Sequence, residues 1–507
     1  MRELFLSSKN LSKLDILKEL LFVTEGVFIQ KLTLKYEVSY STKIRYITEL
    51  TEDLNKLFPS TDLSIKKWEN TDLYFIANLQ NLDIDYIIDY VRLAYIQESS
   101  LYPVTLEILS KNYSSANQLA LNLDISPSKI YASIVKINSV LELFDAQITL
   151  TTSRDNFAGN ETGIRFANYF LLWSIFRTKK FTQLFSYVPD NYLDITALKK
   201  SLAITGNITL SIETKLRIIQ SISLYRIIFM GKQTNLPSTF YEEIELCYDP
   251  NFCFEPEIEQ AIPADILLKE KKLIYFAIQG LIDDLYTFEH KEAVVKKYQH
   301  SQLAIAKNLA AFLHNFENSF SLTFTYTNYI ETYYTLLLTI FYAKYINVDF
   351  TDFYDVEPSV EKFKTLNPKY EHFENSLKTF ILSQKELLKL GIDLKDPKTL
   401  KQIVYLLSWS MYIAKKDQPL KIGIQISSNI YLGQAIKKTI ADFIPQEGFA
   451  FTTNPDHMDI LISDTYEGNY PSIYKYYFEN HSNPRTWREL IAFINQVRWN
   501  RKLDWEN

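Results

Sequence analysis

Residues 115–131 read Ser-Ala-Asn-Gln-Leu-Ala-Leu-Asn-Leu-Asp-Ile-Ser-Pro-Ser-Lys-Ile-Tyr, and this stretch decides how the first third of the chain folds. Small Ala120 allows two helices to cross closely, and Ile125 fills the turn between them. Ser126 provides a capping residue, and the proline that follows it suits the first position of a helix. The stretch therefore predicts a helix-turn-helix, with helices over 115–123 and 127–144.

The outer face of the second predicted helix carries polar and basic side chains. Isoleucines at 130, 134 and 137 recur at helical spacing and define the buried face, and no acidic residue occurs from 125 to 141. Such a helix can enter the major groove of DNA, where Ser and Lys offer donors to base edges or phosphates. The alternative is a helical hairpin that belongs to a bundle and never meets DNA. The candidate DNA-binding residues of this helix are Ser126, Ser128, Lys129, Tyr131, Ser133 and Lys136.

Predicted helices over 83–97 and 101–112 precede this motif, and short strands over 148–150 and 156–158 follow it. The motif with its hairpin is a winged helix-turn-helix unit.

The same order of elements occurs once before. Helices over 11–23 and 29–36 are followed by a turn at 37–39, a longer helix that ends before Pro59, and strands over 63–68 and 73–77. The start of the longer helix is also free of acidic residues. For the two lysines of the hairpin, a solvated strand face is the alternative. The candidate DNA-binding residues of this first unit are Ser39, Ser41, Thr42, Lys43, Arg45, Tyr46, Lys66 and Lys67.

Composition gives a chain of several domains with large cores. The 507 residues are 47% hydrophobic and 15% aromatic, and the length suggests about three to five domains. Net charge is −6, and residues 1–165 hold 17 Lys and Arg against 21 Asp and Glu. DNA binding must therefore depend on the local distribution of charge. Cys247 and Cys253 match no zinc pattern and favour a reducing compartment, so neither metal nor cofactor is expected.

No membrane segment is expected. Charged residues interrupt residues 1–20, which lack the apolar centre of a secretory signal, and the most apolar stretch, 332–343, is shorter than the roughly 20 residues that span a bilayer. We expect a cytoplasmic protein. Apolar residues recur at helical spacing over most of 163–414, and strand-like runs alternate with helices from 420 to 502. The predicted fold is mainly α and multidomain, with an α/β module at its end.

The second predicted hairpin leads into Phe-Ala-Gly-Asn-Glu-Thr-Gly-Ile-Arg-Phe at 157–166, and then into a helical bundle. With this junction and its two winged units, the chain resembles the Mga/AtxA/RofA-like virulence regulators of Gram-positive bacteria. The resemblance implies two helical bundles similar to phosphotransferase-system (PTS) regulation domains, called PRD domains, and a C-terminal domain similar to enzyme IIB that mediates dimerisation. The implied domains are 1–80 and 81–163, the two winged units; 164–285 and 286–416, the two bundles; and 417–507, the enzyme IIB-like domain.

In such regulators, phosphorylation of histidine by a phosphocarrier protein adds negative charge to the bundles. The first bundle here has no histidine, and Gly231-Lys232 follows Tyr225-Arg226-Ile227 where relatives can carry one. A structural role is the alternative for any single histidine on a helix. The candidate phosphorylation sites are His300, His314 and His372 of the second bundle.

The loop that carries the reactive cysteine in true enzyme IIB domains is Ser-Ser-Asn-Ile at 427–430 here, and it has no thiol. A serine there is expected to cap a helix. We therefore expect a domain kept for assembly, with no phosphoryl transfer and no other enzymatic activity.

Together these features predict a regulator that binds double-stranded promoter DNA as a homodimer and responds to carbohydrate status. A protein-interaction scaffold, whose helix-turn-helix units bind a protein, is the alternative that the acidic net charge supports. An active phosphotransferase component is a third interpretation, which the missing thiol disfavours. Arg45 is the single residue among the predicted recognition faces suited to bidentate base reading, so readout of DNA shape is expected to contribute.

Overall fold

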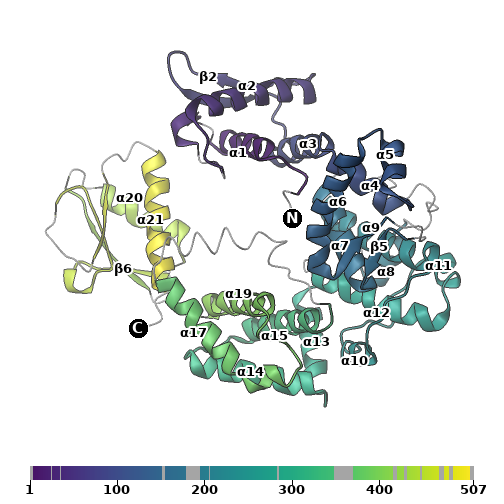
Figure 1. The fold of residues 1–507 in the computed structure, drawn as a ribbon. Coiled ribbons are helices and arrows are strands. Elements are labelled where there is room, and N and C mark those ends of the chain that lie inside the picture. The colour runs from purple at the N-terminus through teal and green to yellow at the C-terminus, as the bar shows by residue number, and fades with distance from the viewer. Residues whose placement is uncertain are drawn as a thin grey trace. The chain divides into compact units, whose positions relative to one another are not determined.

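The computed structural model describes residues 4–23, 25–32, 34, 36–150, 155–177, 194–204, 206–282, 285–346, 369–414, 419–427, 431–445, 448–466, 473–478 and 484–502. The fold is mainly helical (Figure 1). It divides into two compact units, one of Met1–Thr287 with Phe341–Phe353 and one of Phe288–Ile340 with Tyr354–Asn507. Among the helices of the described ranges, none combines the length and the apolar character needed to cross a membrane.

The first unit begins with a winged arrangement. Its sheet has the antiparallel order β1-β3-β2, and Leu63 pairs with Asn78. Leu17, Leu50 and Leu54 lie fully buried in its core. The Lys13 ammonium contacts a carboxylate oxygen of Asp53 at 2.5 Å and so ties the first helix to the second. The elements are α1 (Ser8–Phe22), β1 (Val27–Phe28), η1 (Ile29–Lys31), α2 (Tyr40–Leu57), β2 (Leu63–Lys67) and β3 (Leu73–Asn78).

The helix predicted over 29–36 is wrong, because the described residues of this stretch form only the single 3-10 turn η1. Residues 27–28 pair with β3, and the Ile29 amide donates to the Asp72 carbonyl oxygen. The start of this segment is therefore bonded to the sheet instead of forming a helix. The carbonyl oxygens of Ile29 and Leu32 accept from the Lys43 ammonium at 3.4 and 2.7 Å. Tertiary contacts therefore satisfy the groups that a helix would have used.

A second winged arrangement follows. Its hairpin pairs Ala146 with Gly159 and Ile148 with Phe157, slightly earlier and later along the chain than the predicted strands. The helices agree with the sequence prediction to within a few residues. The elements are α3 (Ile84–Gln97), α4 (Leu101–Ser110), α5 (Ala116–Leu123), α6 (Pro127–Leu141), η2 (Glu142–Phe144), β4 (Ala146–Ile148) and β5 (Phe157–Gly159).

A helical bundle completes the first of the two compact units. Residues 341–346 return to it from a later part of the sequence, since the Tyr342 ring stacks on Phe276 with 4.5 Å between the ring centroids. Gly280 makes room for that ring, because a Cβ there would lie 2.2 Å from it. The elements are α7 (Glu161–Ile175), α8 (Thr196–Ser201), α9 (Leu210–Leu224), the π-helical η4 (Tyr225–Phe229), α10 (Ser238–Glu243), α11 (Pro256–Gln260), α12 (Ala264–Leu281) and the π-helical η6 (Tyr342–Ile346).

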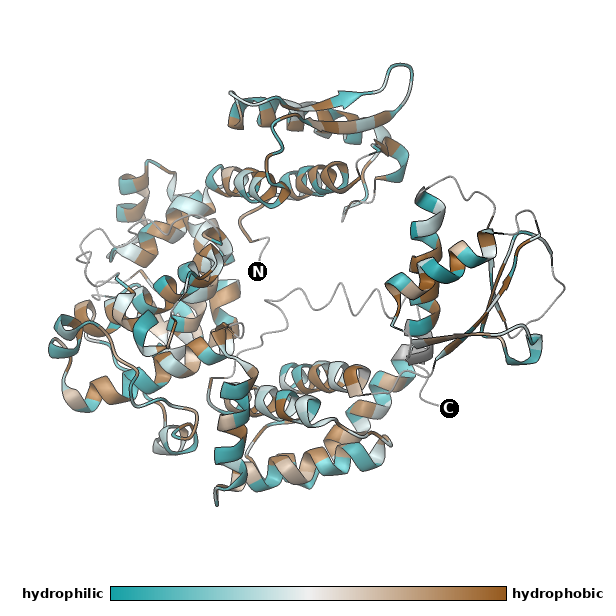
Figure 2. Cartoon of the chain, turned by 180° about the vertical axis from the view of Figure 1, so that it is seen from behind, coloured by the Kyte–Doolittle hydropathy of each residue, from teal (hydrophilic) through white to brown (hydrophobic). Residues whose placement is uncertain are grey.

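The second unit contains further helices and a parallel sheet of order β7-β6-β8-β9. Ile422, Ile436, Ile460 and Ile494 form part of the core between this sheet and its helices. The strands of the sheet are largely brown in Figure 2, whereas the helices show both colours, as amphipathic helices do. The elements are α13 (Phe288–Gln299), α14 (Ala304–Ser319), α15 (Tyr326–Phe341), α17 (Lys369–Ser383), α18 (Lys385–Leu388), α19 (Pro397–Ala414), β6 (Leu420–Gln425), α20 (Leu432–Phe443), β7 (Phe449–Phe451), η8 (Pro455–His457), β8 (Ile460–Ser463), β9 (Tyr474–Tyr477) and α21 (Pro484–Lys502).

Candidate nucleic-acid interface

Helices α5 and α6 form a helix-turn-helix whose turn is well defined. The Ser115 hydroxyl accepts from the Gln118 amide and caps α5. The helix ends at Asp124, which adopts the left-handed conformation with φ 52°, and the amide of Ile125 donates to the Ala120 carbonyl oxygen at 3.1 Å. Aspartate is one of the few residues other than glycine that tolerate this conformation. The turn therefore directs the chain into α6 without a glycine.

The inner face of α6 fixes its orientation. Ile130, Ile137 and Leu141 are buried, and they pack the helix on its unit together with Leu119 and Ala120 of α5. Two predictions about α6 need correction. Ser133 is only 4% exposed, because it follows Ile130 by three residues and precedes Ile137 by four, and these spacings place it on the core side.

The second correction concerns the start of α6. Ser126 occupies the capping position but makes no side-chain bond to a backbone amide, and its hydroxyl lies 3.3 Å from that of Ser128. The helix start therefore depends on Pro127 in the first turn, where the missing N–H has no cost.

The outer face of α6 exposes Ser126, Ser128, Lys129, Tyr131 and Lys136, as predicted. The ammonium group of neither lysine forms a hydrogen bond or ion pair within the described ranges, so both are available to a ligand. Tyr131 is 58% exposed. The structure adds Val135, which is 68% exposed and lies one turn beyond Tyr131 on the same face. Its spacing of i+7 from Ser128 was the sequence signal that could have identified it.

The first winged unit offers fewer free groups than predicted. Tyr46 is only 8% exposed, so its assignment to the recognition face is wrong; it lies next to the buried Ile47 and Leu50 in the core. The Lys43 ammonium is also not free as predicted, because it donates to the carbonyl oxygens of Ile29 and Leu32. The Ser39 hydroxyl caps α2 by accepting from the Thr42 amide.

Other predicted residues of this unit remain accessible. Ser41 and Arg45 are exposed on α2, with the Arg45 guanidinium 5.6 Å from the Tyr46 ring centroid. Lys66 is exposed near the end of β2 and has no ion pair among the described residues. Lys67 pairs with Asp72 at 3.2 Å. Of the cations predicted to bind DNA in the first winged unit, Arg45 and Lys66 have no ion pair among the described residues, and they lie on the helix and on the wing.

Two asparagines, the buried Asn156 and the half-buried Asn138, hold the second wing, and the sequence analysis did not single them out. The Asn156 side chain accepts from the Tyr113 amide at 2.8 Å and donates to the Ile108 and Lys111 carbonyl oxygens. The Asn138 side chain of α6 accepts from the Ile148 amide at 2.7 Å. The wing is thus bonded both to α6 and to the end of α4, which gives the helix-turn-helix a rigid support.

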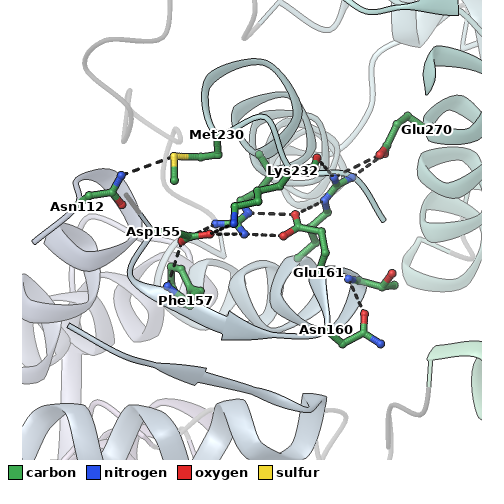
Figure 3. A network of polar contacts seen from close by, with 11 residues as sticks. Asn112, Asp155, Phe157, Asn160, Glu161, Met230, Lys232 and Glu270 are labelled. Atoms are coloured by element: carbon green, nitrogen blue, oxygen red, sulfur yellow. Dashed lines mark hydrogen bonds and ion pairs between the residues drawn. The ribbon is translucent and has the colours of Figure 1, made fainter. Parts of the chain in front are cut away.

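A buried ionic network joins this wing to the bundle (Figure 3). The Arg226 guanidinium of η4 contacts both carboxylate oxygens of Asp155 at 2.9 and 3.0 Å, and both oxygens of Glu161 at 2.5 and 3.0 Å. Burial alone would raise the pKa of Asp155, but the hydrogen bonds and the charge of Arg226 outweigh burial and lower it. Asp155 therefore stays ionised next to the wing.

The same network continues into α12. Arg165 contacts Glu161 at 2.9 Å and both oxygens of Glu270 at 2.6 and 3.3 Å. Both arginines belong to stretches noted in the sequence, the Ile-Arg-Phe junction and Tyr-Arg-Ile at 225–227. Their carboxylate partners lie up to 105 residues away. No sequence spacing indicated the pairs of long separation, whereas Glu161 and Arg165 are four residues apart on α7.

The three candidate histidines are exposed and lie at or near separate helices. His300 follows α13, and its Nδ1 lies 2.7 Å from the Lys296 carbonyl oxygen. His314 of α14 has its Nε2 3.1 Å from the amide nitrogen of Asn318. His372 lies in the first turn of α17. No contact among the described residues brings these imidazoles together.

The C-terminal loop is described only at Ser427, and residues 428–430 lie outside the described ranges. The Ser427 amide and hydroxyl both donate to an Asp464 carboxylate oxygen, at 2.8 and 3.1 Å. Ser427 is therefore not the predicted helix cap, since α20 begins only at Leu432. Within the described part of the chain, no group of three or more His, Cys, Asp or Glu side chains is placed to hold a metal ion.

The geometry of α3–α6 and the hairpin defines a winged helix-turn-helix protein, a class that binds DNA. Residues 87–173 match the family model described as the Mga helix-turn-helix domain. This match supports the resemblance to Mga-like regulators, and it includes α6, the second wing and most of α7. A search of curated proteins found no match to the chain.

Proposed function

We propose that this protein is a transcription regulator of the Mga type, without enzymatic activity, that binds promoter DNA as a homodimer. The observation that carries the proposal is α6, with two unpaired lysines on an acid-free exposed face within a segment that matches a DNA-binding domain family. Phosphates need only a few cations on one face. The acidic net charge of the chain is therefore compatible with this local surface.

The first winged unit extends the proposed interface. Arg45 and Lys66 provide two further cations without ion pairs among the described residues. Two of its four predicted cations are engaged, because two carbonyl oxygens hold Lys43 and Asp72 pairs with Lys67, whereas both predicted lysines of α6 have no ion pair among the described residues. We assign most of the affinity to the second unit and added contact length to the first.

The test is binding of the full-length protein to duplex DNA over a series of salt concentrations. We expect the logarithm of the binding constant to fall linearly with the logarithm of salt, with a slope of about −0.9 for each phosphate contacted. A flat slope, or no binding at low salt, would contradict the proposal and would favour a protein partner for these helices.

Dimerisation is proposed through the C-terminal module. Large aromatic side chains of that module lie exposed, among them Tyr431, Phe443, Tyr466 and Tyr477. Exposed aromatic residues are enriched at protein interfaces, where they supply much of the binding energy. This supports an assembly role for a module whose described loop residue, Ser427, has no thiol.

Response to carbohydrate status is proposed through His300, His314 and His372. All three imidazoles are accessible, so a phosphocarrier protein can reach them. The experiment is transfer of radiolabel from phosphorylated carrier protein to the wild type and to His→Ala variants of each site. We expect label on the wild type and its loss in the variant that lacks the phosphorylated histidine. Absence of label on the wild type would contradict this part of the proposal.

A further inference from the structure

The exposed face of α6 has an apolar centre with cations on one side only. At 3.6 residues per turn, Ser128, Ala132 and Val135 fall on one line along the helix, since they are related by i, i+4 and i+7. Tyr131 borders this line on one side, and Lys129 and Lys136 border it on the other. All six side chains are exposed.

The chemistry of this line limits what it can recognise. Ala132 and Val135 end in methyl groups, and none of the side chains on the line has the paired donor and acceptor that read guanine or adenine bidentately. The apolar group that base edges present in the major groove is the C5-methyl of thymine, which Ala and other apolar side chains contact. Val135 is 68% exposed, and nothing in the described parts of the protein covers it.

Building on the proposed DNA binding, we infer that α6 selects its site by apolar contact of Val135 and Tyr131 with thymine methyl groups. The lysines on one edge of the line hold the helix against a phosphate strand, and the line itself faces the bases. The affinity then comes mainly from Lys129 and Lys136, whereas discrimination between sequences comes from Val135 and Tyr131.

The experiment compares two duplexes of one sequence, enriched by the wild-type protein from a random pool. One duplex contains thymine, and the other contains deoxyuridine at each thymine position, which removes the methyl groups alone. We expect the uracil duplex to bind more weakly, by about fourfold for each methyl group contacted. The slope of binding against salt stays the same for both duplexes, because the phosphates are unchanged.

Two variants complete the test. Val135→Ala combined with Tyr131→Ala is expected to bring the thymine-to-uracil ratio close to one and to leave the salt slope unchanged. Leu268→Ala, which shortens an exposed apolar side chain on α12, is the matched control and is expected to keep the wild-type ratio.

The outcomes separate this inference from the function on which it rests. Equal wild-type affinity for the two duplexes, with a steep salt slope, overturns thymine recognition and leaves DNA binding intact. An unequal ratio that persists in the double variant assigns the difference to duplex shape and also overturns it. Failure to enrich or bind any duplex contradicts DNA binding itself.

Discussion

Asp155 shows how a single buried carboxylate connects the second wing to the bundle. Its neighbour Asn156 bonds the wing to α4, while Asp155 binds Arg226 of η4 through two hydrogen bonds. A buried ion pair costs desolvation, and the loss of Asp155 leaves Arg226 with Glu161 as its remaining carboxylate partner, so part of the compensation of its charge is lost. We therefore expect the junction to depend strongly on this residue.

For the variant Asp155→Asn, we expect the opening free energy of residues 155–177 to fall by about 1–3 kcal/mol at pH 7, because Glu161 still compensates part of the Arg226 charge. The pKa of Asp155 is lowered in the folded protein, so its stabilising contribution is complete above the ordinary aspartate pKa of about 4 and is lost as the pH falls through the lower native value. The wild type should therefore lose protection in acid more steeply than the variant does.

Peptide-resolved hydrogen exchange, corrected for the intrinsic pH dependence of exchange, measures both effects. Asp62→Asn removes an exposed carboxylate of the same unit and is the control, with little change expected. Equal protection in the two variants would mean that the Asp155–Arg226 pair does not hold the junction.

At the scale of elements, glycines allow the second wing and α7 to meet. A Cβ on Gly163 would lie 1.8 Å from the Phe144 carbonyl oxygen, and a Cβ on Gly159 would lie 2.2 Å from the Asp145 carbonyl oxygen. These contacts explain two glycines of the Gly-Asn-Glu-Thr-Gly junction in physical terms. The first has a positive φ of 121° as well.

Two opposing effects determine the result of Gly163→Ala. Alanine favours a helix over glycine by about 1 kcal/mol, but overpacking against a backbone oxygen costs typically 1–3 kcal/mol, and at 1.8 Å the clash should win. We expect net destabilisation of α7, seen as faster hydrogen exchange in residues 157–175. Gly206→Ala, with no atom within 4 Å of the added Cβ, is the control and should be neutral or slightly stabilising. Slower exchange in Gly163→Ala would contradict the close approach.

The sequence was informative where a helix buries one regular apolar face. The isoleucines of α6, Ile125 in the turn and the proline at position 127 predicted both helices and their connection. The prediction failed at residues 29–36, where pairing with β3 and the Lys43 ammonium override helix periodicity. It also placed Ser133 and Tyr46 on the exposed faces of their helices, whereas both side chains are buried. Both residues lie at the border between the apolar and the polar face, where helical spacing alone does not decide exposure. Ion pairs of long sequence separation, such as Arg226 with Asp155, had no signal at all.

For the whole molecule, the proposed dimer has a direct test. We expect sedimentation of the wild type to show a dimer, and Phe443→Glu combined with Tyr477→Glu to raise the dissociation constant at least tenfold, since a buried charge is costly at an interface. Both side chains are exposed, so the variant should fold. Leu382→Glu, on the exposed surface of α17, is the control and should remain a dimer. A wild type that stays monomeric at micromolar concentration would contradict the assembly.

The central claim is that α6 holds DNA by charge, and it is tested most directly by Lys129→Ala combined with Lys136→Ala. The matched control is Lys297→Ala combined with Lys389→Ala, which removes the same charge from exposed sites of the second unit. In a mobility-shift titration over several salt concentrations, we predict that the α6 variant binds more weakly and that its salt slope is smaller by up to about two. The control should bind as the wild type does. Unchanged affinity and slope in the α6 variant would contradict the account.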